Sequence, residues 1–184
     1  MRKYIAIALV TSACAFAASR ADAQPFLTPF AGVTFGQDAP DQQLTYGAGL
    51  TFMGKAAGFE VDFGYTPDFF NQDDAVVFIA DSNLMTLMGN LVVGPGVGPV
   101  RPYFVAGTGL MRTRVENPFA NVTSNDWGVD IGGGVLAKVG EHVGIRGDLR
   151  YFRYLQDSTN DDDLDIELGH FDFWRATAGI SLGF

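Results

Sequence analysis

The sequence predicts an all-β protein, an eight-stranded antiparallel up-and-down transmembrane β-barrel. Three observations lead to this fold class. Apolar and polar residues alternate in many segments with the period of two that is typical of β-strands. After residue 23, no unbroken apolar run reaches the length of a membrane-spanning helix, so only strands could cross a bilayer. Glycine (23 residues) and phenylalanine (16 residues) are abundant, whereas the runs of Leu, Glu and Lys that favour helices are missing.

The first 23 residues have the features of a secretory signal peptide. Arg2 and Lys3 precede a short apolar run, and Ala21-Asp22-Ala23 is a small-x-small cleavage site. We therefore predict a signal peptide at 1–23 and a single barrel domain at 24–184. The only cysteine, Cys14, lies in the signal peptide, so we expect no disulfide. A lipoprotein cleaved before Cys14 is the alternative.

The stretch Trp174–Phe184 shows the alternation most clearly. Its apolar face begins and ends on an aromatic ring, and at about 3.3 Å per residue it could cross a bilayer when tilted. In the fifth strand, either of two sets of alternate residues could face outward, and we choose the set that contains Phe104, Ala106 and Leu110. The other predicted strands cover 26–36, 44–53, 58–65, 84–93, 101–115, 127–139 and 143–151.

The connections between these strands provide an independent test of the assignment. Those after the second, fourth and sixth strands are short: 55–57, 94–99 and 140–142. Those after the first, third, fifth and seventh strands are longer: 37–43, 67–82, 116–125 and 156–170. Transmembrane barrels alternate short periplasmic turns with long outer loops in this way.

The C-terminal Phe184, preceded by Ile180 and Leu182 on the same face, resembles the membrane-assembly signal of bacterial outer-membrane barrels. The whole of 24–184 resembles the small eight-stranded outer-membrane β-barrel family, which includes the OmpA transmembrane domain, opacity proteins and OmpX-like proteins. This resemblance implies an integral protein of the Gram-negative outer membrane, exported through a cleaved signal peptide and inserted by the barrel-assembly machinery. It implies contact with outer-membrane lipid and lipopolysaccharide, and a role in membrane integrity, adhesion or surface interaction. We expect a monomer.

Eight charged residues fall on the predicted inward face. Burial of an unpaired ion is costly, so we predict that they pair with one another and fill the lumen. The interior of an eight-stranded barrel is just filled by side chains, which favours a plugged barrel. A porin-like channel with a gated ion pathway is the alternative. The predicted network consists of Glu60, Asp62, Asp130, Lys138, Arg146, Asp148, Arg150 and Arg175.

A soluble lipocalin-like binder with eight strands would invert this arrangement, with apolar residues inside and charges in water. Here the charges share a face with Gly, Thr and Ser, which suits a narrow, packed interior. The opposite face is apolar on strand after strand, and soluble proteins rarely expose such patches. The terminal Phe184 decides in favour of the membrane.

The predicted long loops are acidic and contain no Lys or Arg. In the last loop, Asp161, Asp163, Asp165 and Glu167 alternate, and their oxygens could hold a surface-bound Ca²⁺ or Mg²⁺ that bridges to lipopolysaccharide phosphates. A solvated acidic loop is the alternative. A surface or host ligand would meet these loops. The net charge of −9 argues against a nucleic-acid partner.

We find no catalytic constellation and expect neither an enzyme nor a cofactor. His142 and His170 lie at opposite ends of the predicted barrel, and no cluster of Cys and His could hold zinc. The enzymatic alternative is a lipid A-modifying barrel of the deacylase type, which uses a His-x-Ser pair. In this sequence His170 is followed two residues later by Asp172, so the serine nucleophile is missing.

Overall fold

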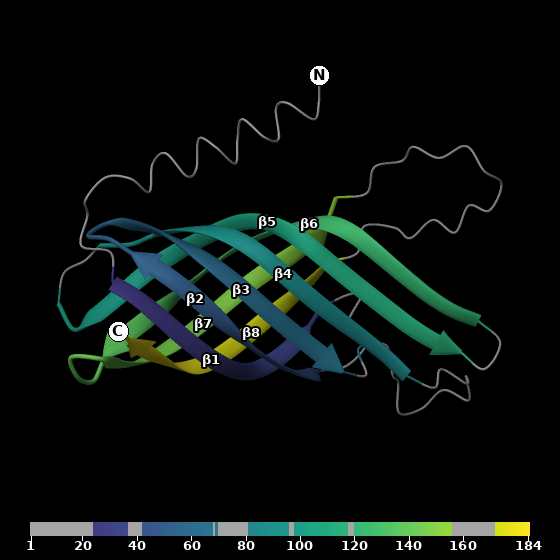
Figure 1. Ribbon diagram of the computed structural model, residues 1–184, viewed down its shortest axis with the longest axis horizontal. Helices are drawn as coiled ribbons and strands as arrows, with labels where there is room; N and C mark the ends of the chain where they lie inside the picture. Colours follow the sequence, from purple (N-terminus) through teal and green to yellow (C-terminus); the bar gives the residue numbers. More distant parts are fainter. Residues whose placement is uncertain are drawn as a thin grey trace, which may run out of the picture.

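The computed structural model describes residues 24–36, 42–67, 69, 81–95, 98–117, 120–155 and 172–184. Eight antiparallel strands form a closed barrel in which each strand pairs with its neighbours in sequence and β8 pairs with β1 (Figure 1). Among the described residues, no helix is long and apolar enough to cross a membrane. The strands are β1 (Gln24–Phe35), β2 (Gln43–Met53), β3 (Ala57–Pro67), β4 (Asp81–Val93), β5 (Val100–Asn117), β6 (Ala120–Lys138), β7 (Val143–Tyr154) and β8 (Asp172–Gly183).

The two ends of the barrel differ. The start of β1, the end of β8, the turns 54–56 and 139–142, and the described residues 94–95 and 98–99 lie at one end, which we call the short-turn end. The ends of β1, β3, β5 and β7 and the starts of β2, β4, β6 and β8 lie at the other, which we call the long-loop end. The strands run obliquely between the two ends (Figure 1), as they must in a closed barrel.

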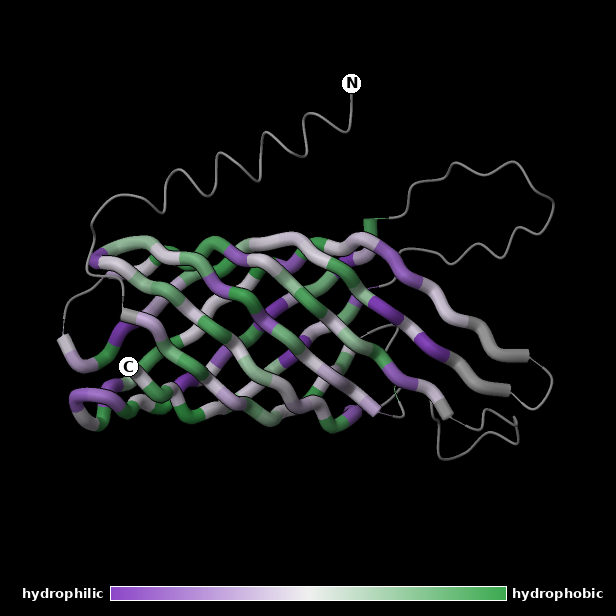
Figure 2. The backbone as a smooth tube through the Cα atoms, in the orientation of Figure 1, coloured by the Kyte–Doolittle hydropathy of each residue, from purple (hydrophilic) through white to green (hydrophobic). Residues whose placement is uncertain are grey.

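The predicted faces of the strands are confirmed. Phe63, Leu87 and Ile180 are 39%, 48% and 55% exposed on the outside, whereas Asp62 and Arg175 are 2% and 3% exposed inside. Hydrophobic and hydrophilic residues alternate along the strands (Figure 2). The inverted, lipocalin-like arrangement is therefore wrong, because the charged side chains point to the axis and the apolar side chains away from it.

The chosen phase of the fifth strand is also confirmed. Phe104 is exposed, whereas Tyr103 and Val105 are buried. The two sets of residues were hard to distinguish by hydropathy because this strand is apolar on both faces. Its inward face packs in an apolar part of the interior described below.

One predicted connection is wrong. We expected a long loop over 116–125, but β5 continues to Asn117 and β6 begins at Ala120. The antiparallel ladder runs without interruption to the pair Asn117↔Ala120. A polar sequence can remain paired beyond a barrel wall, because the ladder satisfies its backbone groups while its side chains meet water. The hairpin therefore projects past the end of β7, whose last pair with β6 is Gly128↔Tyr154.

Candidate functional site: an ionic layer inside the barrel

Seven of the eight predicted interior charges meet in one layer across the barrel, which we call the ionic layer. Six of them are buried and Asp148 is nearly so. Their alternate spacing on each strand places them on one face, and the closed barrel brings β3 opposite β6, β7 and β8. The members are Glu60 and Asp62 on β3, Asp130 on β6, Arg146, Asp148 and Arg150 on β7, and Arg175 on β8.

Glu60 is held from two sides. Its Oε1 accepts a hydrogen bond from Arg150 Nη2 at 2.7 Å. Its Oε2 pairs with Arg146 Nη1 and accepts the Thr51 hydroxyl at 2.6 Å. This fully buried carboxylate therefore has charged or polar donors at both oxygens, which is the condition under which a buried ion is tolerated.

Asp148 lies between two arginines of its own strand. Arg146 Nε donates to its Oδ2 at 2.7 Å and Arg150 Nη2 donates to its Oδ1 at 3.0 Å. Residues two apart on a strand share a face, so the pattern Arg-x-Asp-x-Arg places the carboxylate between the guanidinium groups. Arg146 Nε also donates to the hydroxyl of Tyr103 at 2.6 Å.

Arg150 and Arg175 are directly opposite each other in the β7–β8 ladder. Two like charges in this position would repel, and Asp62 reaches across the barrel to separate them. Its Oδ1 accepts from Arg175 Nη2 at 2.5 Å, and its Oδ2 lies 3.8 Å from Arg150 Nη1. Asp130 completes the layer, with its Oδ2 at 3.6 Å from Arg150 Nη1. Arg150 thus faces four carboxylates.

Small residues on the inward face make room for these side chains. A Cβ at Gly64 would meet Arg175 and Thr86, and one at Gly134 would meet the Tyr103 ring. Glycine without a side chain permits this close approach in a narrow barrel. The inward glycines and the long ionic side chains are therefore complementary parts of one packed interior.

Apolar clusters lie on both sides of the ionic layer. At the long-loop end, Phe152 stacks on Phe173 with ring centroids 4.9 Å apart. The rest of this cluster is Phe69, Leu84, Met88 and Met111. The cluster at the short-turn end consists of Met53, Val92, Tyr103, Val105 and Leu136.

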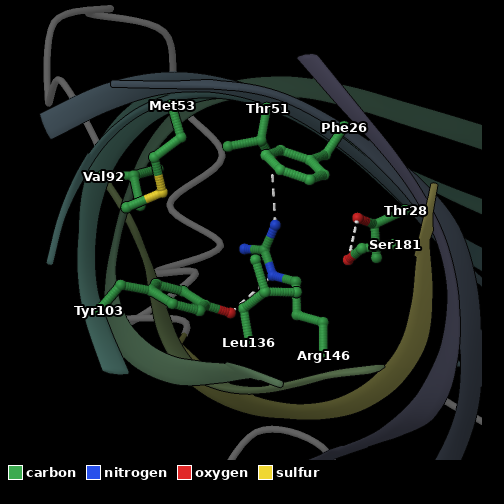
Figure 3. A pocket seen from close by; sticks show the side chains of 9 residues that line it. All are labelled: Phe26, Thr28, Thr51, Met53, Val92, Tyr103, Leu136, Arg146 and Ser181. Atoms are coloured by element: carbon green, nitrogen blue, oxygen red, sulfur yellow. Dashed lines mark hydrogen bonds between the residues drawn. The ribbon is translucent and has the colours of Figure 1, made fainter. Parts of the chain in front are cut away.

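A cavity of about 10 Å³ lies between the short-turn cluster and the ionic layer (Figure 3), which is space for about one water molecule. Thr28 and Ser181 share a hydrogen bond of 2.8 Å on its wall. Figure 3 shows Arg146 extending into this space toward Thr51 and Tyr103. Its lining residues are Phe26, Thr28, Thr51, Met53, Val92, Tyr103, Leu136, Arg146 and Ser181.

Lys138, the eighth predicted member, does not lie in the ionic layer. It has the inward register at the end of β6, but it is exposed at the barrel mouth, where its ammonium lies 5.8 Å from the centre of the Phe26 ring. The prediction was wrong for Lys138 because strand alternation gives the face of a residue but not its depth. A long side chain at a strand end reaches water easily.

Several participating residues were missed from the sequence. Thr51 and Tyr103 complete the hydrogen bonds of Arg146 and Glu60. The Asn90 amide, oriented to satisfy both its groups, donates to Asp130 Oδ1 at 2.7 Å and accepts from Arg150 Nη1 at 3.0 Å. Asn90 could have been included in the predicted network, because the alternation already placed it on the inward face of the fourth strand. Arg101 donates to the carbonyl oxygens of Gly54, Lys55 and Gly94 at 2.7–3.3 Å, and so ties together two turns at the short-turn end.

Other predicted residues lie elsewhere. Ile180 and Leu182 are exposed on the outer face of β8, and the backbone N–H of the exposed Phe184 donates to Pro25 O at 3.3 Å. Asp161, Asp163, Asp165, Glu167 and His170 lie outside the described residues, as does the signal peptide at 1–23. In the part of the chain that the structure describes, no group of His, Cys, Asp and Glu residues could hold a metal ion.

Comparison with known proteins gives one family. The profile of the outer membrane protein beta-barrel domain matches residues 6–181. No curated protein sequence matches the chain.

Several solved barrels are similar in structure. Neisserial surface protein A has a TM-score of 0.69 and 15% identity, over 87% of this chain and 97% of that one. The N-terminal barrel domain of Pseudomonas aeruginosa OprF has a TM-score of 0.60 and 16% identity, over 90% and 100%. Yersinia pestis Ail, in complex with the heparin analogue sucrose octasulfate, has a TM-score of 0.57 and 13% identity, over 88% and 97%. At these identities the similarity shows a shared fold.

Proposed function

The chain belongs to the outer membrane protein beta-barrel domain family and is a barrel of the bacterial outer membrane, and on this premise we propose that it serves as a closed barrel. In this role it supports the integrity of the membrane and presents its long-loop end for adhesion or surface interaction. Barrels of this type place short turns in the periplasm and long loops outside the cell.

The ionic layer is the observation that carries this proposal. Arg146, Arg150 and Arg175 are paired with four carboxylates across the lumen. A permeating ion would have to replace one partner of a buried pair, which leaves the other charge uncompensated. It would then have to pass the apolar cluster at each end. Three successive barriers favour a structural role over permeation.

Single-channel recording in planar bilayers tests the proposal. We expect no stable conductance from the wild-type barrel, from Glu60→Ala or from Arg146→Ala, because both apolar clusters remain in each. Arg153→Ala is the matched control, since Arg153 lies on the same strand as Arg146 but faces outward. A steady ohmic conductance in the wild type, or one that opens in Glu60→Ala but not in Arg153→Ala, would favour a porin-like channel with a gated pathway.

The acidic long loops support a particular class of surface partner. Ail was solved with a polysulfated glycan analogue, whereas the predicted long loops of this chain carry carboxylates and no Lys or Arg. We therefore propose a cationic surface ligand, or Ca²⁺ and Mg²⁺ that bridge the loops to lipopolysaccharide phosphates. Cells that express the chain should adhere better than vector controls to immobilised cationic peptide, and no better to heparin. The reverse order would contradict this choice.

We also propose that the barrel is not an enzyme. Asp172, which takes the place of the deacylase serine, accepts a hydrogen bond from the Tyr151 hydroxyl at 2.5 Å. A carboxylate in this position offers no alcohol nucleophile for acyl transfer. Overexpression should leave the mass spectrum of lipid A unchanged, and a new deacylated species would contradict the proposal.

A further inference from the structure

Positive charge on the outer wall is confined to one side of the barrel. Arg112 and Arg114 on β5 and Arg153 on β7 are exposed on the outward face near the long-loop end. The remaining Lys and Arg residues of 24–184 lie in the ionic layer or near the short-turn end. Near the long-loop end, the described outward residues of β1 to β4 and of β8 include no Lys or Arg.

Trp127 lies between two of these arginines. On β6, Trp127 stands between the outward residues Asn125 and Val129, and the ladder pairs Arg112 with Asn125 and Arg153 with Val129. Arg112 and Arg153 are therefore diagonal neighbours of Trp127 on its two sides. Diagonal positions on one face of a sheet are about 7–8 Å apart, within reach of long side chains. Each guanidinium group can thus reach a phosphate group beside the indole ring, one from each side.

The outer surface around Arg112, Trp127 and Arg153 lies at the height of the membrane interface. Trp127 is 58% exposed, and Tyr151 and Trp174, whose ring centroids are 5.2 Å apart, lie near the same end on β7 and β8. Aromatic girdles of this kind mark the boundary between hydrocarbon and headgroups. Leu110, directly opposite Trp127 on β5, and Ile131, further along β6 toward the short-turn end, are exposed and apolar. The arginines accordingly lie where lipid headgroups begin.

The two arginines are available for a ligand. Within the described chain, no carboxylate forms an ion pair with Arg112 or Arg153. Asp172, directly opposite Arg153 on β8, accepts the Tyr151 hydroxyl and bounds the surface on that side. Both arginines lie on a chain whose net charge is −9, so their grouping differs from the general surface of the protein.

We propose that Arg112, Trp127 and Arg153 form a binding site for the phosphate groups of an outer-leaflet glycolipid. The inference rests on the proposed function, because it needs the long-loop end to face outward in the outer membrane. The planar guanidinium group matches phosphate with two parallel hydrogen bonds, which the ammonium group of lysine cannot do. The acyl chains of the same lipid would lie against Leu110 and Ile131, and the indole ring would lie against its sugar.

Fluorescence of Trp127 tests the site directly. The chain has two tryptophans, so Trp174→Phe in the full barrel leaves Trp127 as the only reporter. In detergent micelles, titration with bis-phosphorylated lipid A should shift the Trp127 emission and saturate. In the same background, Arg112→Gln/Arg153→Gln should raise the half-saturating concentration at least about tenfold, because each lost charge-assisted pair weakens binding. Asp172→Asn should lower it, because a nearby negative charge is removed.

The controls distinguish a specific site from a general effect of charge, from binding of any anionic lipid and from loss of folding. Lys55→Gln/Lys138→Gln removes the same charge from exposed side chains at the short-turn end and should leave the half-saturating concentration unchanged. Dephosphorylated lipid A and phosphatidylglycerol should bind at least tenfold more weakly than bis-phosphorylated lipid A. Equal binding by phosphatidylglycerol, or an unchanged titration in the double arginine variant, would overturn the proposal. Heat-modifiability on gels verifies that each variant is a folded barrel, and conductance tests the proposed function separately.

Discussion

The ionic layer and the apolar cluster at the long-loop end occupy the same inward face of the barrel, yet they are held by different forces. Arg150 faces four carboxylates, drawn from β3, β6 and β7. Each ionic partner is needed, because loss of one leaves a buried charge without compensation. Phe152, Leu84 and their neighbours are held by apolar contacts, which have no preferred direction. Loss of one of these side chains therefore leaves a space that the others partly fill. We therefore expect the ionic layer to disfavour other staggers of the strands, and the apolar cluster to add stability that depends less on exact position.

The largest effect should follow from Arg150→Met, which keeps the bulk of the side chain but leaves four carboxylates with two guanidinium groups. We expect a loss of about 4 kcal/mol in the free energy of unfolding, since one partner of several buried pairs is removed. Urea unfolding in lipid vesicles measures it. Arg153→Met on the same strand faces outward and should change the free energy by less than about 1 kcal/mol. Equal losses in the two variants would show that the buried ion pairs of Arg150 contribute no more to stability than an outward arginine.

A smaller effect should follow from Leu84→Ala in the long-loop cluster. We expect a loss of roughly 3 kcal/mol from the lost transfer energy and the residual cavity, measured in the same unfolding assay. Leu87→Ala on the outer face is the control and should cost less, because lipid chains fill the space that it leaves. Leu84→Ala should also leave the barrel closed in planar bilayers, because the ionic layer is intact. Conductance in this variant would show that the apolar cluster alone closes the lumen.

The smallest effect should come from the polar pair on the wall of the cavity. Ser181→Ala removes the hydrogen bond to Thr28 and should cost about 1 kcal/mol, because it leaves the Thr28 hydroxyl buried and unsatisfied. Thr28→Val/Ser181→Ala, which removes both polar groups, should recover most of that loss. If the double variant is instead as unstable as the sum of the two single variants, the pair behaves like a member of the ionic layer.

The alternation of residues, together with the terminal Phe184, predicted the fold and the faces of the strands. Glu60, Asp62, Arg146 and Asp148 alternate with apolar or small neighbours, which places the charged residues of each strand on one face, and Phe184 identified that face as the interior. Which of these residues pair with one another could not be predicted from the alternation. Contacts between β3 and β7 depend on the stagger of the whole barrel, which is the sum of all the strand registers and has no local sequence signal.

The dependence of contacts on the whole barrel also explains the predictions that were wrong. Lys138 has the correct face, but its depth in the lumen depends on where β6 ends. The division of the interior into an ionic layer and two apolar clusters was not visible either, because Phe152 on β7 meets Leu84 on β4 and Met111 on β5 only across the closed barrel. The continuation of β5 and β6 to Asn117 and Ala120 was missed because polar residues were assigned to a loop, although paired strands outside a membrane can be polar on both faces.

The seam between β1 and β8 has a consequence for biogenesis. Because these strands come from opposite ends of the domain and pair from Phe26↔Gly183 to Phe35↔Trp174, the cylinder cannot shut until its final strand has arrived. An incomplete intermediate would present two unsatisfied sheet edges and a charged inner surface to hydrocarbon, a state that is very costly. Insertion and closure should consequently occur as one concerted event, with the nascent edges shielded until Arg175 enters beside Asp62.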